Sequence, residues 1–497
     1  MKHRSPWMVL TLLFVFTAGF SGQAAATNGM NLEGYGPIAV SMGGASFAYM
    51  NGTAAMMNNP ATLSLMPSGM LLDLAFGNLG PNVEAIVTTP MGSMTAESEA
   101  TAFYMPAFGF FVRKENYGFG IGLFSQGGMG TEYGADSWLS DPSMGANTAL
   151  TEGLVNRSEV GVGRVLVPFT YDIDEQWSVG ASFDFVWAGM DLQMALSEAQ
   201  FQNLANPMAQ TLGTASGTLV DAFGQLYEPF GGTGIATLHH AYFDFSNESS
   251  LTGEAKGYGV AGKIGVVYKA NERVTLGATF HSPTFLGDLE TENAELSMAV
   301  NADPTIFGLP AGDNIDAEIP LSGTVTVKDF QWPWVLGGGI AVEPHEQVLL
   351  ALDVKYVAWS SVMEDFSMTF TADEVPENGN FGGLSMDATL LQEWEDQIVL
   401  SLGGAYKPVE ELTLRGGFNY GKNPVPDNLL NALFPAIVET HLTLGAGYDF
   451  DESMGLNGSL TYGFEKSQEN PGNGSTIPPV ESTHSQLNWM LMFSYGF

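Results

Sequence analysis

The chain has 497 residues, and its 54 aspartates and glutamates outnumber its 16 lysines and arginines, which gives a formal net charge of −38. A nucleic acid is not an expected partner, because binding to phosphates needs clustered positive charge. The absence of cysteine excludes disulfides, thiolate metal sites and cysteine nucleophiles.

Residues 1–26 have the features of a secretory signal peptide. Lys2 and Arg4 precede an apolar run over 7–20, and three alanines end at Ala26. We expect cleavage after Ala26, which leaves 14 − 54 = −40 charges on the mature chain. No later segment has the roughly 20 continuous apolar residues of a membrane helix, so the mature chain is either soluble or a β-barrel.

Residues 27–68 differ from everything that follows. They are rich in glycine, alanine, methionine and asparagine, and they lack sustained alternation of apolar and polar residues. We predict that this stretch is a plug, or hatch, inside the lumen of a barrel formed by residues 69–497.

Period-two alternation dominates after residue 69. Apolar side chains recur at every second position from Trp177 to Trp187, with Ser178, Ser182 and Asp184 between them. Such alternation places one set of side chains on each face of a strand. A soluble sandwich alternates too, but only 14% of this chain is charged, 11% is aromatic and 61 residues are glycine. That composition suits a barrel whose outer face meets lipid.

The connections distinguish the two folds. Short charged turns occur near 113–117, 172–176, 269–273, 343–347, 407–411 and 449–453, and long connections separate them: 129–156, 192–254, 283–320, 361–396, 423–440 and 465–483. Tight turns that alternate with long loops are typical of outer-membrane barrels, with the turns in the periplasm. We therefore predict an all-β, transmembrane antiparallel β-barrel of about 14 strands, counting 321–342 as one strand bent near Pro333.

The C-terminus supports the same location. Six large apolar residues alternate to the last position: Leu487, Trp489, Leu491, Phe493, Tyr495 and Phe497. A soluble protein rarely exposes such a row with nothing left to cover it. The row resembles the signal read by the barrel-assembly machinery, so we expect that machinery and outer-membrane lipid as partners, and the bacterial outer membrane as the location.

Patterns for enzymatic chemistry are weak. Residues 257–262 fit G-x-G-x-x-G, but they run into a predicted strand and not into the helix that a dinucleotide site requires. His239 and His240 are adjacent and cannot point at one metal from a regular strand or helix. No catalytic residue, metal site or cofactor is predicted.

Two charged residues are expected inside the barrel. Alternation places Asp184 and Arg415 opposite the aromatic rows, toward the lumen. Arg415 could bind a fatty-acid carboxylate, or it could pair with a lumenal acid or with the plug.

The connection over 192–254 carries apolar residues at helical spacing. One set is Leu204, Met208 and Leu212, and the other is Leu219, Phe223, Leu226 and Phe230. Short amphipathic helices over the barrel mouth fit this spacing. Their apolar faces would either form a groove that captures ligand or pack on each other as a loop core.

Three places in the sequence resemble the FadL family of outer-membrane transporters. The first is the small-residue stretch with Gly34-Tyr35-Gly36, residues 41–45 and Asn58-Asn59-Pro60-Ala61. The second is the glycine-rich run over 118–133. The third is Asn423-Pro-Val-Pro426 with the segment 435–445 that follows it.

The resemblance implies that hydrophobic ligands, above all long-chain fatty acids, are captured at outer loops and leave sideways through a gap in the barrel wall. It implies a hatch that contains Gly43, Gly44, Asn59, Pro60 and Ala61. It also implies a lateral gate at a kinked third strand, made by Ser125, Gln126, Gly127, Gly128, Met129 and Gly130. Alternatives are an aromatic or aliphatic hydrocarbon channel of the same family, a surface adhesion or structural barrel, and a general porin.

Overall fold

The computed structural model describes residues 28–89, 92–141, 154–206, 211–247, 253–474 and 477–497. The predicted signal peptide lies outside these residues. Within them, no helix has the length and apolar character to cross a membrane. Strands dominate, and they form one extended antiparallel sheet.

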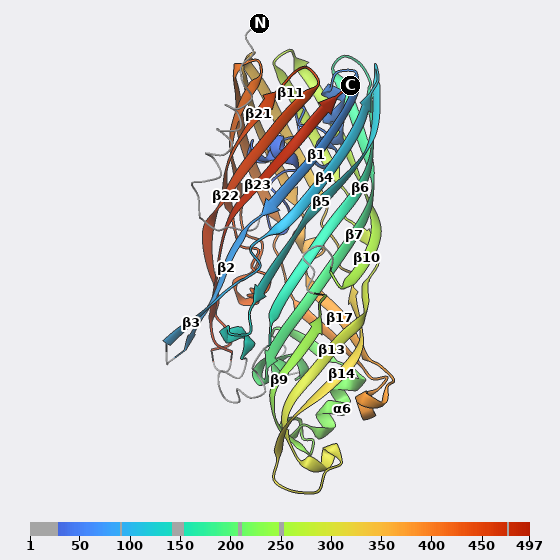
Figure 1. Cartoon of the computed structure of the whole chain (residues 1–497), viewed down its shortest axis with the longest axis vertical. Helices are drawn as coiled ribbons and strands as arrows, with labels where there is room; N and C mark the ends of the chain where they lie inside the picture. Colours follow the sequence, from blue (N-terminus) through green and yellow to red (C-terminus); the bar gives the residue numbers. More distant parts are fainter. Residues whose placement is uncertain (1–27, 90–91, 142–153, 207–210, 248–252, 475–476) are drawn as a thin grey trace.

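That sheet closes on itself to form a barrel (Figure 1). Its last strand pairs with its first, with Leu71 opposite Gly496 and Asn78 opposite Trp489. The predicted transmembrane antiparallel barrel is confirmed. The ring runs, in order, through β1 (Gly69–Leu79), β4 (Phe103–Arg113), β5 (Tyr117–Tyr133), β6 (Asn156–Asp172), β7 (Trp177–Ser197), β10 (Ala255–Asn271), β11 (Val274–His281), β15 (Val335–His345), β16 (Val348–Val357), β19 (Gln397–Val409), β20 (Leu412–Gly421), β21 (Thr440–Asp449), β22 (Met454–Asn470) and β23 (Val480–Gly496).

Side chains alternate across the wall as the sequence predicts. In β7, Trp177, Phe183 and Phe185 are exposed, while Ser182 and Asp184 are buried. Large apolar side chains therefore face outward and small polar ones face the lumen, the reverse of a soluble barrel. An outer surface of this kind matches a lipid environment.

Aromatic pairs mark two levels on the outer face. Trp177 stacks on Tyr268 beside the short turns, with 4.4 Å between ring centroids. Further along the same two strands, Phe185 stacks on Tyr258 at 6.2 Å. Aromatic rings gather where a barrel meets the two membrane interfaces, so these levels indicate the edges of the apolar band. Recognition of β23 by the barrel-assembly machinery stays a prediction.

Three of the six predicted long connections, 192–254, 283–320 and 361–396, contain further strands, which extend the sheet beyond the barrel. Starting from the outer part of β7, the extension is ordered β9 (Ile235–Phe245), β13 (Leu289–Ala302), β14 (Ile315–Lys328), β17 (Asp365–Ala372), β18 (Ser385–Leu391) and β8 (Gly213–Ser216). In Figure 1 it projects from the end of the molecule opposite the C-terminus. Shorter strands are β2 (Pro81–Thr89), β3 (Gly92–Glu97) and β12 (Phe285–Leu286).

Residues 321–342 do not form the single bent strand that we predicted. They divide between β14, which pairs with β13 and β17, and β15, which pairs with β11 and β16. Asp329 has a positive φ of 53°, and Pro333 lacks the N–H that a central strand donates. The chain therefore leaves the extension and enters the barrel wall as a new strand.

The N-terminal segment, residues 28–66, lies inside the ring as short helices: α2 (Gly36–Val40), α3 (Ala55–Asn58) and η1 (Pro60–Leu65). Wall side chains on separate strands bind its backbone. Asp353 Oδ2 accepts from Ser46 N at 2.6 Å, and Asp73 Oδ2 accepts from Thr53 N at 2.7 Å. These bonds hold the segment against β16 and β1 at once, so it occupies the lumen.

A buried ion cluster crosses three neighbouring wall strands beside this segment. Asp184 on β7 accepts a hydrogen bond from Arg164 on β6 at 2.9 Å and another from Lys263 on β10. All three side chains are at most 2% exposed. One carboxylate thus balances two cations in the packed lumen, and the predicted lumenal position of Asp184 agrees with its place in the structure.

Replacing Asp184 with Ala should strongly destabilise the folded barrel. Two buried cations would lose their only carboxylate partner in this cluster, a change that typically costs about 3–5 kcal/mol. The measurement is the temperature at which the compact band of unheated protein converts to the unfolded band on a gel. Lys422→Ala, which breaks an exposed pair with Glu395, is the control and should leave that temperature almost unchanged. Equal temperatures for Asp184→Ala and the wild type would contradict the prediction.

Candidate functional site

The barrel wall is interrupted between β4 and β5. The two strands pair only from Phe108 opposite Leu123 to Arg113 opposite Gly118. Beyond that point, residues 103–107 of β4 stay paired with β1, and residues 124–133 of β5 stay with β6. The strands therefore diverge, and Figure 1 shows β5 turning away from β4.

A bulge in β5 accompanies the divergence. The register between β5 and β6 shifts between Ser125 and Gly127, so Gln126 is an extra residue. Backbone groups near the bulge bind the N-terminal segment in place of β4. Gly127 forms a β-bridge with Asn31, and the Tyr35 hydroxyl donates to the Gln126 carbonyl at 2.7 Å. Bulges commonly bend a strand and end its pairing on one side.

Glycine is required at the bulge for two reasons. Gly127 has a φ of +154°, and a Cβ there would lie 2.2 Å from the Met30 carbonyl oxygen. At Gly128, a Cβ would lie 2.2 Å from the Val160 carbonyl oxygen. A larger side chain at either position would push away the N-terminal segment or β6, so these glycines permit the close approach of three backbones.

A cavity of about 370 Å³ opens at the interruption. Its lining comes from both edges of the gap and from the outer side of β6 and β7, where Gly161 and Gly163 form a floor beside Trp187. The volume lies within the roughly 300–1,000 Å³ of typical small-molecule sites. Of the predicted gate, Ser125, Gly127, Gly128, Met129 and Gly130 line this cavity, whereas Gln126 is buried and its side chain binds Asn31.

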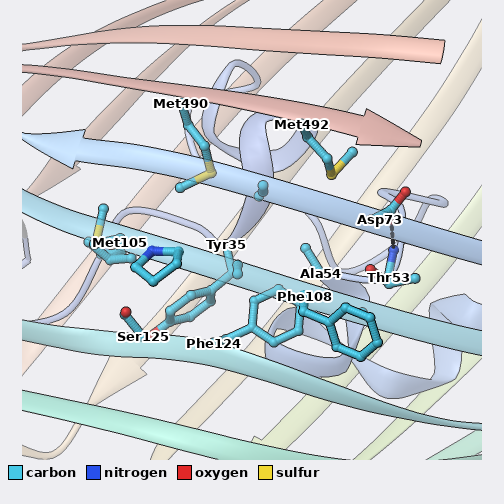
Figure 2. A pocket seen from close by; sticks show the side chains of 16 residues that line it. Tyr35, Thr53, Ala54, Asp73, Met105, Phe108, Phe124, Ser125, Met490 and Met492 are labelled. Carbon is cyan, nitrogen blue, oxygen red and sulfur yellow. Dashed lines mark hydrogen bonds between the residues drawn. The ribbon is translucent and has the colours of Figure 1, made fainter.

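A smaller cavity of about 20 Å³ lies between the N-terminal segment and strands β1, β4, β5 and β23. Figure 2 shows Tyr35, Phe124 and Phe108 on one side of it and Met490 and Met492 on the other. Both cavities share four lining residues: Met105, Pro106, Phe124 and Ser125. The gap in the wall is therefore contiguous with the part of the lumen that the N-terminal segment fills.

The predicted hatch residues lie in that segment but away from the gap. Gly43 has a φ of +69°, and a Cβ there would lie 2.4 Å from the Phe418 carbonyl oxygen on β20. Gly44, with a φ of +85°, packs on the Glu33 carbonyl in the same way. Asn59 begins η1: its Oδ1 accepts from Ala61 N at 3.1 Å, and its Nδ2 donates to Phe47 O at 2.8 Å.

Pro60 and Ala61 lie against the wall at β7. The Cβ of a residue in place of Gly180 would lie 2.5 Å from Ala61 N and 2.6 Å from Pro60 C. Gly43, Asn59, Pro60 and Ala61 thus contact the wall closely, whereas Gly44 packs within the segment, and the structure does not bring these five residues together with the gate.

The predicted capture residues lie in the extension. The first apolar face was expected to continue from Leu204 to Leu212, which is wrong: α5 (Glu198–Ala205) ends first, and Leu212 directly precedes β8. The other residues lie on α6 (Thr218–Leu226) and η3 (Glu228–Phe230). Met208 lies outside the described residues.

These helices pack on one another through aromatic rings. Phe201 contacts Phe223 at 5.5 Å and Phe230 at 6.1 Å, and Tyr227 contacts Phe230 at 5.1 Å. Burial raises the pKa of the Tyr227 phenol, and its hydrogen bond to Glu198 raises that pKa further. Much of the apolar surface of α5 and α6 is therefore a loop core.

A cavity of about 50 Å³ remains beneath α5 and α6. Leu204, Leu219 and Phe223 contribute to its lining, and the floor comes from β9, β13, β17 and β18. Every lining residue is apolar. The loop core and a small apolar cavity therefore coexist in the extension.

A tryptophan cluster in the lumen was not anticipated from the sequence. Trp332 and Trp359 contact at 5.8 Å between ring centroids, and Trp359 and Trp394 at 5.2 Å. All three are nearly fully buried, and Trp332 Nε1 donates to Asn31 Oδ1 at 2.7 Å. Their sequence positions just before or after strands give no direct signal, because the cluster forms only when the ring closes.

The lumenal cations are already engaged. Arg164 and Lys263 bind Asp184, and Arg415 Nη1 donates to Asn457 Oδ1 at 2.9 Å. Lys355 Nζ donates to the Glu33 carbonyl at 2.9 Å. In the described part of the chain, no group of three or more His, Asp or Glu residues is arranged to hold a metal ion.

The comparison with known proteins agrees with this geometry. A family model for outer membrane protein transport proteins (OMPP1/FadL/TodX) matches residues 15–487. The chain is 22% identical over 386 residues to the long-chain fatty acid transport protein of Salmonella typhi, covering 77% of this chain and 75% of that protein. It is also 43% identical over 81 residues, 16% of this chain, to an uncharacterized protein of Chlorobium limicola, of which it spans 38%.

The structure resembles the crystal structure of the P. putida toluene transporter TodX. Identity is 30%, the TM-score is 0.75, and the match covers 94% of this chain and 99% of that chain. With a family model over most of its length and a closed lipid-facing barrel, the chain belongs to the OMPP1/FadL/TodX family and is a transporter of hydrophobic compounds in the bacterial outer membrane.

Proposed function

We propose that the chain imports uncharged hydrophobic molecules, which leave sideways through the gap between β4 and β5. The observation that carries the proposal is the 370 Å³ cavity at an unpaired stretch of wall. Moving a hydrophobic molecule into water costs about 0.8 kcal/mol of free energy for every CH₂ group that becomes exposed. Exit through the wall keeps the molecule in apolar surroundings, whereas exit into the periplasm does not.

The N-terminal segment supports a lateral route over a straight one. Its backbone binds wall residues on β1, β16, β20 and β21, so it occupies the lumen below the gap. In this proposal it acts as a hatch that blocks a water-filled path. A general porin needs a wide polar channel, which a filled lumen does not provide.

The capture step is assigned to the extension. Its apolar cavity beneath α5 and α6 lies on the side of the barrel from which β7 continues outward, two strands away from β5. Most of the apolar residues of this cavity belong to the same buried cluster as the lumenal tryptophans and Met129 of the gap cavity. An adhesion or structural role would not require the gap.

The state of the cations favours a neutral ligand over a fatty acid. The lumenal cations Arg164, Lys263, Lys355 and Arg415 already bind protein groups. The lining of the gap cavity includes one acidic residue, Glu159, and one lysine, Lys256. A carboxylate ligand therefore has few free cationic partners in the described part of the chain.

We therefore propose hydrocarbons as the first candidate ligands, with small aromatic hydrocarbons foremost. They rank ahead of the long-chain fatty acids that the sequence predicts. Similarity to a toluene transporter at 30% identity supports this order. Long-chain fatty acids are the second candidate, which the more distant similarity to the Salmonella typhi fatty acid transport protein supports.

Gly161→Phe should block the exit without disturbing the fold. A Cβ at Gly161 meets no atom within 4 Å, and the residue lines the gap cavity. A phenyl ring there occupies the space that a ligand needs, so initial uptake of labelled toluene by cells should fall at least about tenfold. Capture of toluene by the purified protein should persist.

The control is Gly404→Phe, which adds the same ring to the outer face of β19, where a Cβ has only ordinary contact with Leu350 at 3.5 Å. Both variants should keep the heat-dependent gel shift of a folded barrel. Uptake that stays at the wild-type rate in Gly161→Phe would rule out this exit route while leaving the barrel assignment intact.

The ligand class can be tested by deleting the gene and restoring it. Uptake of toluene should drop on deletion and return with the wild-type chain, whereas uptake of oleate should change much less, because its carboxylate finds few free cationic partners. Both rates are measured in the same cells at low ligand concentration. Loss of oleate uptake alone would establish the fatty-acid alternative.

A further inference from the structure

The gap cavity contains one buried polar atom that the protein leaves without a partner. His484, on β23, lines this cavity together with Pro435 and Met129. Its side chain is 2% exposed and lies on the lumenal face of β23, opposite to the exposed Trp489. Of the residues that line the cavity, His484 alone has a buried side-chain nitrogen or oxygen that forms no hydrogen bond within the described part of the chain, and that atom is Nε2.

The other ring nitrogen determines what Nε2 can bind. Nδ1 of His484 is hydrogen-bonded to the Pro435 carbonyl oxygen. A carbonyl oxygen only accepts, so Nδ1 carries a proton. His484 lies on the extracellular side of the aromatic pair Phe76 and Trp489, where β23 pairs with β2, and burial lowers the pKa of its ring to about 4. The ring is therefore neutral near neutral pH, and Nε2 is a hydrogen-bond acceptor.

The other polar groups of the lining are engaged or reach solvent. Thr131 donates to the Leu433 carbonyl at 3.1 Å, and Glu159 accepts from Arg157 at 2.7 Å. The remaining polar side chains are exposed or half-buried: Tyr104, Ser125, Trp187, Lys256 and Tyr258. His484 Nε2 is therefore the buried, neutral acceptor that is left for a ligand.

A ligand that satisfies this atom needs an apolar body and one hydrogen-bond donor. The cavity of about 370 Å³ is mostly apolar, and a few placed polar groups commonly orient a ligand in such a site. An ionised carboxylate has no proton to donate, whereas a neutral hydroxyl has one. A water molecule can make the same hydrogen bond, but a hydroxylated ligand makes it while its carbon skeleton also fills the apolar cavity.

We propose that the gap cavity binds neutral hydroxylated aromatics, of the phenol class, whose hydroxyl donates to His484 Nε2. The inference rests on the proposed function, because it concerns the same cavity, and it adds a second ligand class to the hydrocarbons. His484 is then a residue that determines specificity, since it orients the ring of a phenol at the lumenal side of the gap. Hydrocarbons bind through apolar contacts and do not depend on Nε2.

The first test compares three ligands of similar shape. The hydroxyl of para-cresol donates, the ether oxygen of para-methylanisole only accepts, and para-xylene does neither. Dissociation constants are measured on the purified full chain in one detergent, so that partition of each ligand into micelles cancels between variants. In His484→Phe, the affinity for para-cresol relative to para-xylene should fall about three- to tenfold, the effect of one hydrogen bond. The relative affinity for para-methylanisole should not change.

Tyr133→Phe is the matched control. The Tyr133 hydroxyl donates to the Ala432 carbonyl at 2.9 Å, so this variant also removes a hydrogen bond to the segment that carries Pro435, but Tyr133 does not line the cavity. It should keep the wild-type ratio of affinities. In His484→Phe, the Pro435 carbonyl still accepts from Ile437 N at 2.8 Å, so the segment keeps that contact.

The second test needs no variant. Wild-type crystals soaked in para-bromophenol should show an anomalous bromine peak in the gap cavity, with the hydroxyl at hydrogen-bonding distance from His484 Nε2. An unchanged ratio in His484→Phe, an equal loss in Tyr133→Phe, or a bromophenol whose hydroxyl points away from Nε2 would each overturn the inference. If para-xylene binds and is imported in those cases, the proposed function stands; if neither para-xylene nor para-cresol binds, both fail.

Discussion

A strand that faces lipid must find a partner for every backbone N–H and carbonyl group, since the hydrocarbon core offers none. In the described part of the wall, each strand pairs with both neighbours, but β4 and β5 pair over only part of their length before they diverge. There, the N-terminal segment takes the place of a neighbouring strand: Asn31 bridges Gly127, and Tyr35 binds the Gln126 carbonyl. The opening and the segment are therefore one structural unit.

Electrostatics fixes the same segment from other directions. Asp353 and Asp73 on opposite parts of the ring bind its backbone N–H groups, while Lys355 binds its carbonyl groups. Wall charges thus act on an almost uncharged polypeptide through its peptide dipoles.

Much of the barrel could be predicted from the sequence, because its physics is local. The alternation along Trp177–Trp187 depends on residues that are close together in the chain, and so do the short turns. These two patterns predict where the wall strands lie. The extension could not be predicted in this way. Its strand β18 pairs with β8 although Asp387 and its partner Ser216 are far apart in sequence, and no local pattern reports such a pairing.

The functional site likewise has features that depend on residues close in sequence and features that depend on distant contacts. The glycine run over 127–130 signals a distorted strand, and the structure places its members at the gap. The side on which the strand opens depends on contacts with Met30, Asn31 and Trp332, which join distant parts of the chain. Helical spacing identified α6 but not the end of α5, because a short helix in an irregular connection is ended by its packing and not by its periodicity.

The outer floor made by Gly161 and Gly163 also restricts where this protein can have neighbours. On the proposed route, a molecule that leaves through the gap between β4 and β5 would enter the membrane over a narrow arc of the circumference, and that arc would have to border fluid lipid. Another barrel packed against it would seal the exit as completely as a mutation. In a crowded outer membrane, the strands on the far arc, such as β19 and β20, would then be the ones that adjoin other proteins, so a lateral route of this kind would fix how the molecule is oriented among its neighbours.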